Sequence, residues 1–213
     1  MSELFMYVPP AFCVSDLPTL HDFIERHSFG LLVSLREGAP FASHLPFLLD
    51  RRAGEQGTLV GHVARANPHW NQCEGQEALA VFSGPHAYIS PTWYGSANVV
   101  PTWNYVAVHA TGRMRLVEDP AGLLDIVQRT VEVYERGMPN PWTRPDTGTF
   151  IERLLSQSGG FRIEIERLEG KWKLSQNHPE ERQKKVASAL AGRNDENSKE
   201  IATLMRERSE TAK

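Results

Sequence analysis

Six strand-like segments follow one another along this chain, and few of the connections between them are long enough to hold a helix. The first three are FGLLVSL, PFASHLPFLLD and residues 58–63, with Arg36-Glu37-Gly38 as a hairpin turn after the first. The next is EALAVFSGPHAYISP, which we expect to break at Gly84-Pro85. PTWNYVAVHATGRMRLV then predicts a long strand or a hairpin bent around Gly112, and FRIEIERL predicts the last strand. This succession predicts a mainly β protein, a small antiparallel barrel with peripheral helices.

Helix-start signals stand between some of these strands. Asn67 and Asp119 each come directly before a proline and Asp16 comes two residues before one, as residues that cap helices do. A further helix is expected around residues 150–155. From about residue 179 charged residues dominate and predict one or two surface helices. We therefore expect a barrel domain over residues 1–178 and a charged helical C-terminal appendage over residues 179–213.

Composition excludes several classes of protein. The 213 residues carry a net charge of −3, which gives no electrostatic footprint for nucleic acid or an anionic membrane. The N-terminus lacks a secretory signal pattern, and no apolar run is long enough to span a bilayer. Two cysteines are too few for a disulfide scaffold, so a cytoplasmic location is expected. The eight histidines show no metal-ligand spacing, and we predict no metal.

Two segments offer groups that could hold a small ligand. In GHVARANPHW a strand ends at Arg65 and a helix begins at Asn67, an arrangement suited to a phosphate, although a solvated arginine and a plain helix cap explain it equally. In FASHLPF, alternation along a strand places Ser43 and His44 on opposite faces. A histidine in a strand is also common as a structural residue.

Aromatic residues and lysines mark two more candidate segments. Apolar faces with a few placed donors suit a flat heteroaromatic ligand, and they also suit a barrel core or a dimer contact; these residues are Trp93, Trp103, Asn104 and Tyr105. The stretch EGKWKLSQN is expected to follow the last strand. Its Lys171 and Lys173 either supply positive charge to a reduced, anionic ring or belong to a solvated loop.

These segments together resemble a known family. MYVPPAF, SHLPF, GHVARANPHW, GPHAYISPTWY, VPTWNYVAVHATG and EGKWKLSQN stand in the order seen in PaiB-type proteins, the FMN-binding negative transcriptional regulators of the split-barrel flavoprotein superfamily. The resemblance runs from about residue 6 to residue 190.

The resemblance implies a homodimeric split β-barrel with FMN at the subunit interface. It implies that Arg65 binds the FMN phosphate with His62 and Asn67 beside it, and that Ser43 and His44 run along the edge of the ring. Trp93, Trp103, Asn104 and Tyr105 would line the ring or the facing subunit. By analogy with related oxidases, Lys171 and Lys173 would lie on the substrate side.

The function implied is that of a flavin-linked transcriptional regulator or a low-activity flavin oxidoreductase. No helix-turn-helix pattern is visible, and the basic residues Arg182, Lys184 and Lys185 form only a short patch. An indirect effect through a small molecule or a redox partner therefore fits better than direct DNA binding. The alternatives are a DNA-binding repressor that uses the barrel only to dimerise, and a haem-binding or haem-degrading protein with His178 as axial ligand. No catalytic acid or base is assigned.

Overall fold

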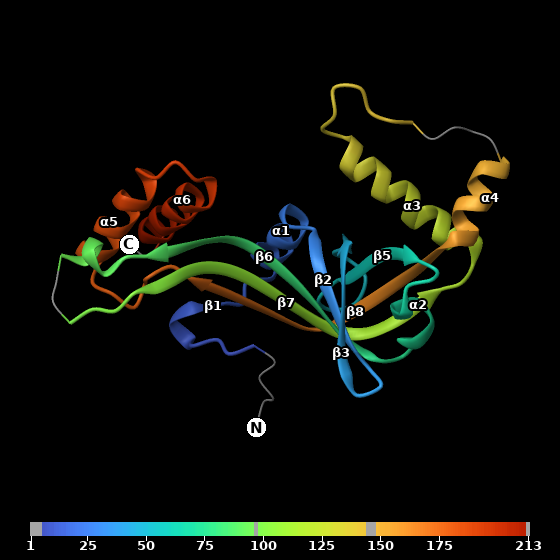
Figure 1. Ribbon diagram of the computed structural model, residues 1–213, viewed down its shortest axis with the longest axis horizontal. Coiled ribbons are helices and arrows are strands. Elements are labelled where there is room, and N and C mark those ends of the chain that lie inside the picture. The colour runs from blue at the N-terminus through green and yellow to red at the C-terminus, as the bar shows by residue number, and fades with distance from the viewer. Residues whose placement is uncertain (1–5, 96–97, 144–147, 212–213) are drawn as a thin grey trace. The chain divides into compact units, whose positions relative to one another are not determined.

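The computed structural model describes residues 6–95, 98–143 and 148–211, and it divides the chain into two compact units that alternate along the sequence. Unit 1 comprises Met1–Leu20, Ser83–Val108 and Glu169–Lys213, and unit 2 comprises His21–Phe82 and His109–Leu168. Three long strands run through both units: β6 (Glu77–Ile89), β7 (Thr102–Val117) and β8 (Ser158–Lys173) (Figure 1). Each unit is therefore described by itself.

Unit 2 is built on an antiparallel sheet. Its shorter strands are β2 (Phe29–Arg36), β3 (Ala39–Pro46), β4 (Leu48–Asp50) and β5 (Thr58–Ala64), and the strand order is β3-β2-β6-β7-β8-β5-β4. The predicted turn at Glu37-Gly38 is confirmed, since both residues have the positive φ values that a tight hairpin requires.

The core of unit 2 lies on both faces of this sheet. On one face the rings of Phe47, Phe82 and Phe161 meet edge to face, with centroids 5.3 and 6.0 Å apart, and all three are buried. On the other face helix α3 (Pro120–Glu135) packs Ile126 against the sheet residues Val60 and Val117. The remaining helices here are α2 (Pro68–Gln72), next to β5, and α4 (Gly148–Gln157), next to α3.

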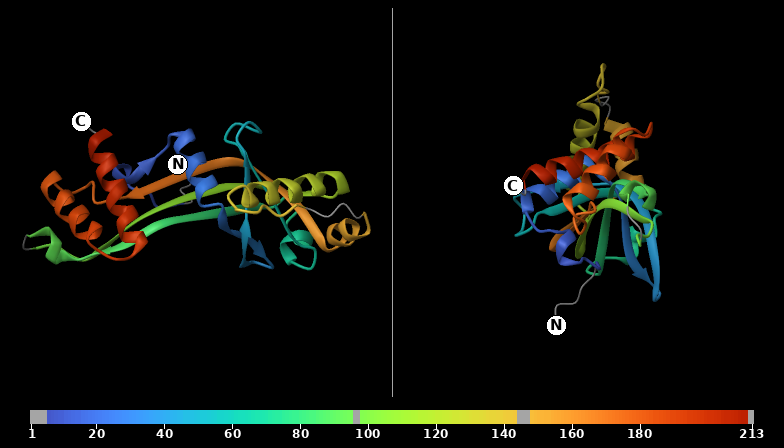
Figure 2. Two further views of the ribbon diagram at one scale, coloured as in Figure 1. Left: turned by 90° about the horizontal axis from the view of Figure 1, so that it is seen from above. Right: turned by 90° about the vertical axis from the view of Figure 1, so that its left-hand side faces the viewer.

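Unit 1 contains the two C-terminal helices and one end of each long strand. Helices α5 (Glu180–Ala191) and α6 (Glu196–Thr211) lie side by side in both views of Figure 2. Val186, Leu190 and Ile201 are completely buried, so the charged tail contains a real apolar seam. The unit also contains β1 (Cys13–Val14), which pairs with the end of β8, and the 3₁₀ turns η1 (Pro10–Phe12) and η2 (Pro91–Tyr94). A domain boundary at residue 178 stays a prediction.

Helix α1 (Leu17–Arg26) lies at a boundary between the units along the chain. Its start is capped as predicted, because the Asp16 carboxylate accepts hydrogen bonds from the backbone and side chain of Thr19. Its unit 2 portion is fixed by Arg51, whose guanidinium pairs with Asp22 and Glu25 at 2.6 and 2.7 Å. In the described ranges, no helix combines the length and apolar character needed to span a membrane.

Two predictions about the strands are wrong, and the structure decides a third point that the sequence left open. The predicted break at Gly84-Pro85 is wrong, since β6 runs unbroken from Glu77 to Ile89. Strand β2 pairs with β6 only up to Val81, which leaves one side of β6 open where a proline without an N–H is tolerated. At Gly112 the chain forms one continuous strand. A Cβ there would lie 1.9 Å from the Glu164 carbonyl oxygen, so this glycine permits close approach of β7 and β8.

The second wrong prediction concerns EGKWKLSQN. The prediction that this stretch follows the last strand is wrong for residues 169–173, which belong to strand β8. Lys171 pairs with Cys13 of β1, and this added strand extends the sheet beyond the apolar run that the sequence displays. The architecture as a whole is the predicted one, a mainly antiparallel β protein with peripheral helices.

Candidate functional site

Arg65 lies in unit 2 on the turn between β5 and α2, and its side chain has a fixed support. Its backbone N–H donates to Gln157 O at 2.8 Å and its Nε donates to Ser158 O at 3.3 Å. The guanidinium carbon lies 5.2 Å from the centroid of the Trp70 ring, within cation–π range. Its Nη groups donate to no protein acceptor in the described part of the chain. The guanidinium therefore stays available to an anion.

The support for Arg65 is itself rigid. Trp70 is buried against Gly159, where a Cβ would come within 2.3 Å of the indole. A pocket of about 340 Å³ opens here, lined by Arg65, Trp70, Leu116 and the exposed carboxylate of Glu118. One cation and one anion thus face the same space.

Ser43 and Asn67 are brought together in unit 2 by hydrogen bonds. Asn67 Nδ2 donates to Ser43 Oγ at 2.9 Å, and Asn67 Oδ1 accepts from the backbone N–H of His69 at 2.9 Å. Ser43 Oγ also bonds His69 Nδ1 at 2.8 Å. Burial lowers the pKa of His69, and the nearby Phe41 backbone opposes part of that shift. The network ties the turn carrying Arg65 to strand β3.

His44 and His62 point elsewhere. His44 is exposed on the opposite face of β3 from Ser43, as alternation predicts, and stacks with Phe29 at 6.3 Å between ring centroids. His62 pairs with Gly160, whose Cα faces Ile126 and Leu123 of α3. His62 therefore lies on the helix-covered face, away from Trp70. Burial lowers its pKa, and its Nδ1 is buried with no hydrogen-bond partner among the described residues.

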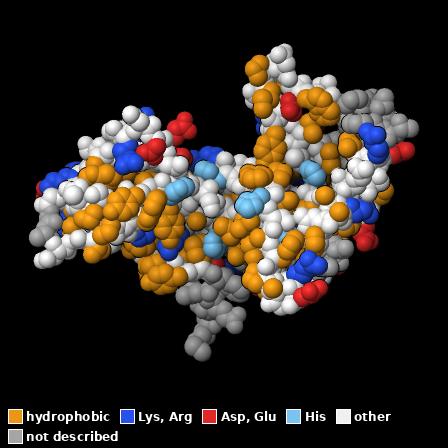
Figure 3. Space-filling model, in the orientation of Figure 1, with side chains coloured by type: hydrophobic (Ala, Val, Ile, Leu, Met, Phe, Trp, Pro, Cys, Tyr) orange, Lys and Arg blue, Asp and Glu red, His pale blue; other side chains and the backbone are white. Residues whose placement is uncertain are grey.

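The aromatic residues of unit 1 form an exposed patch on one sheet face. Trp103 of β7 is 52% exposed, with the rings of Tyr88 and His86 of β6 each 6.0 Å from it between centroids. Lys171, although a lysine, is buried: its Nζ donates to Tyr7 O at 2.7 Å and lies 5.3 Å from the rings of both Tyr7 and Tyr105. Figure 3 shows hydrophobic side chains and histidines gathered over β6 and β7 on this face.

Asn104 and Lys173 lie instead at a separate pocket of unit 1, of about 350 Å³. Asn104 is fully buried and exchanges hydrogen bonds with Ser175 at 3.0 and 3.1 Å. Lys173 Nζ donates to Thr102 Oγ1 and to Trp103 O, both at 2.5 Å. Trp93 is half-buried on η2, next to the pocket residue Tyr94.

The same pocket contains residues that the sequence pattern had not assigned to FMN, although His178 was named as the haem ligand of an alternative. Tyr94, His178 and Arg182 line it, and the Tyr94 and His178 rings lie 4.9 Å apart between centroids. Burial, then the charges of Arg182 and Lys173, lower the pKa of His178. In unit 2 the corresponding omission is His69. Its place two residues after the capping Asn67 was the available signal, whereas nothing local to Tyr94 indicates the pocket.

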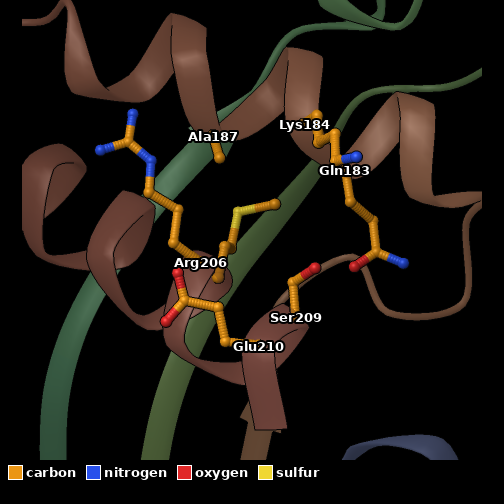
Figure 4. A pocket seen from close by; sticks show the side chains of 7 residues that line it. Gln183, Lys184, Ala187, Arg206, Ser209 and Glu210 are labelled. Carbon is orange, nitrogen blue, oxygen red and sulfur yellow. The ribbon is translucent and has the colours of Figure 1, made fainter. Parts of the chain in front are cut away.

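Two further hollows are less suited to a specific ligand. A cavity of about 210 Å³ lies between α5 and α6, where Gln183 and Lys184 face Arg206, Ser209 and Glu210 (Figure 4). Its charges are of both signs and do not converge on one point. A larger groove of about 640 Å³ lies along α3 and α4 and is mostly apolar, with Trp142 at its rim. Among the described residues no cluster of three or more His, Cys, Asp or Glu side chains could hold a metal.

The chain is similar to known proteins over most of its length. The family model described as "Putative FMN-binding domain" matches residues 6–167. The chain is 35% identical to the Bacillus subtilis protein "Protease synthase and sporulation protein PAI 2", covering 95% of this chain and 98% of that protein. It is 30% identical to an uncharacterized protein of Aspergillus fumigatus, over 80% of this chain and 85% of that protein.

Solved structures show the same fold at low sequence identity. The flavocytochrome Anf3 from Azotobacter vinelandii aligns with a TM-score of 0.60 at 18% identity, covering 76% of this chain and 69% of that chain. The FAD and haem binding protein from Mycobacterium smegmatis aligns with a TM-score of 0.58 at 14% identity, covering 76% and 73%. The resemblance first found in the sequence motifs is thus confirmed over most of the chain. The chain belongs to the PaiB-type family of proteins with a putative FMN-binding domain.

Proposed function

We propose that this protein binds FMN as a homodimer and acts as a flavin-linked regulator or a low-activity flavin oxidoreductase. The observation that carries the cofactor is Arg65, whose guanidinium rests on Trp70 with its Nη groups open to a pocket of unit 2. A guanidinium in this state is suited to bidentate binding of a phosphate. Family membership supplies the expectation that the phosphate is that of FMN.

The residues around Arg65 fit this role with one opposing charge. The Asn67–Ser43–His69 network fixes the turn, so that little conformational entropy is lost when Arg65 binds. Glu118 lines the same pocket, and its carboxylate would repel a phosphate. Arg65 therefore carries the fit, and Glu118 weakens it.

The flavin, when bound, supplies the hydride and electron chemistry. The chain's own residues bind and orient it. Lys173 lies at the separate pocket of unit 1, and Lys171 is enclosed by Tyr7 and Tyr105, so neither lysine is placed at the Arg65 pocket. We assign no catalytic acid or base.

The exposed aromatic patch of unit 1 supports the homodimer. Tyr88 and Trp103 are 45% and 52% exposed on one sheet face, and aromatic residues are enriched where protein surfaces meet. A regulatory effect would then pass through the flavin or a metabolite. The slight net negative charge of −3 argues against direct binding to an operator.

The test is an absorbance spectrum of the purified protein, repeated after FMN addition and desalting. We expect retained bands near ~450 and ~370 nm. Arg65→Ala should weaken FMN binding about tenfold or more while leaving riboflavin, which lacks the phosphate, unchanged. Glu118→Gln should tighten FMN a few-fold. Arg52→Ala, on an exposed loop of unit 2, is the matched control.

Two results would contradict the proposal. A folded protein that retains no flavin would overturn FMN binding, and equal FMN affinities of Arg65→Ala and wild type would overturn the phosphate site. Sedimentation of the same samples measures the dimer. Trp103→Glu is expected to give monomers, and Trp142→Glu, equally exposed on unit 2 at 47%, is expected to leave the dimer intact.

A further inference from the structure

The pocket of unit 1 concentrates positive charge from two elements. Lys173 comes from the end of β8 and Arg182 from the first turn of α5, and His178 lies between them along the chain. No described residue that lines this pocket carries a carboxylate. The two acidic residues that begin α5 do not line it: Glu180 pairs with Lys184 at 2.7 Å and Glu181 pairs with Lys185 at 2.8 Å, although the charge of Glu181 also acts on neighbouring Arg182.

Hydrogen-bond donors remain in the pocket after the protein's own bonds are counted. Lys173 has three N–H groups and uses two of them, on Thr102 and on the Trp103 carbonyl. Tyr94 also lines the pocket, but it is only 2% exposed: burial raises the pKa of its hydroxyl, and the side chain of Ser175 opposes part of that shift. The donor that remains is the third N–H of Lys173, which suits a ligand that supplies an acceptor.

The rest of the lining indicates what accompanies that acceptor. Phe12, Val99 and Val100 give the pocket an apolar wall, and its volume of about 350 Å³ suits a small molecule. We propose that this pocket binds a small organic anion, with its phosphate or carboxylate group on Lys173 and Arg182 and its apolar body against Phe12 and the valines.

The charges of the pocket agree with this assignment. Burial, then the neighbouring charge of Lys171, lower the pKa of Lys173, and His178 is shifted in the same direction. Both shifts reflect the cost of holding positive charge in a confined space. A bound anion removes part of that cost, which favours anions over neutral ligands of the same size.

The anionic group could come from FMN itself or from a separate molecule. Because Arg65 of unit 2 is the group proposed for the FMN phosphate, a separate anion is the expected source. The assignment does not depend on FMN binding. The experiment is accordingly run on the full chain with and without saturating FMN, using phenyl phosphate and benzoate as probes and isothermal titration calorimetry as the readout.

We expect one probe molecule per chain, bound equally well with and without FMN. Arg182→Gln and Lys173→Gln should each weaken binding about tenfold or more, whereas Arg182→Lys should keep most of it. Arg206→Gln, which removes an arginine charge from exposed α6, is the matched control and should change affinity less than about twofold. Thermal melts verify that each variant is folded.

Three outcomes would overturn the assignment. Wild-type protein that binds neither probe rules out the anion site, and equal losses in Arg182→Gln and Arg206→Gln would reduce it to general surface charge. FMN that displaces the probes, together with an Arg182→Gln variant that weakens FMN but not riboflavin, would assign the pocket to the cofactor's own phosphate. Arg65→Ala separates the two proposals, because it should weaken FMN without affecting either probe.

Discussion

The two units hold their ligand-facing cations in different ways. In unit 2 the cation is the single guanidinium of Arg65. Its Nε donates to the Ser158 carbonyl, and the group rests on the face of Trp70. In unit 1 Lys173 lies among other positive groups, with no carboxylate among the described residues that line the pocket. The first cation is stabilised by its support, whereas the second is destabilised by its surroundings.

This difference has consequences for how each site responds to conditions. A guanidinium keeps its charge at any accessible pH, so the affinity contributed by Arg65 depends on its geometry and on salt. A lysine and a histidine whose pKa values are lowered by burial and by like charges gain from an anion and respond to protons. We therefore expect the unit 2 site to fail through packing changes and the unit 1 site to respond to pH.

The largest effect should come from removing the support of Arg65. In Gly159→Ala the new Cβ would approach the Trp70 ring to 2.3 Å, so the indole must move. We expect the free energy of unfolding to fall by about 1–3 kcal/mol. FMN affinity should fall about tenfold because the guanidinium loses its platform. Urea denaturation and FMN titration measure the two effects.

The control for this substitution is Gly137→Ala, because nothing lies within 4 Å of a Cβ at Gly137. It should change stability by less than about 0.5 kcal/mol. Phenyl phosphate binding in unit 1 should be the same in both variants. If Gly159→Ala keeps full FMN affinity, the stacked geometry of Arg65 is not needed for phosphate binding.

A smaller effect is expected at Asn67, which bonds both α2 and β3. Asn67→Ala loses the cap on His69 N and the bond to Ser43, and should lower the free energy of unfolding by about 1–2 kcal/mol. Asn67→Asp keeps an oxygen for the cap and loses only the donor to Ser43, so about half of that loss is expected. Urea denaturation of the three proteins tests this, and equal stabilities of Asn67→Ala and wild type would contradict it.

Features that depend on neighbours along the chain were predictable from the sequence. Asn67 and Asp119 cap their helices as expected, because a capping side chain bonds a backbone N–H two or three residues away. Ser43 and His44 occupy opposite faces of β3 because a strand alternates with a period of two. The family motifs led to the right fold for the same reason, since each is a continuous segment.

Features that depend on distant partners were not predictable. Lys171 is buried by Tyr7, which lies 164 residues earlier in the chain, and no local pattern indicates that contact. Tyr94 joins Lys173 and Arg182 in the lining of the unit 1 pocket only through the packing of η2 against α5. Gly84-Pro85 has the composition of a break, but the early end of the β2 pairing lets β6 continue.

The smallest effect, and the one that separates the two sites most directly, is the pH dependence at His178. The groups around His178 are the Tyr94 ring, Lys173 and Arg182. Protonating His178 without a bound anion therefore adds a third positive charge. A bound anion attracts the protonated imidazolium and therefore raises the pKa of His178. Binding of the anion is then accompanied by uptake of a proton. Benzoate, which stays ionised above about pH 5, should therefore bind several-fold more tightly as the pH falls from about 8 to 5.5.

His178→Gln should remove most of this pH dependence of benzoate affinity while leaving the affinity at the alkaline end unchanged, as calorimetry would show. An identical slope in His178→Gln and wild type would mean that another group takes up the proton, and the contrast between the two units would then rest on charge alone.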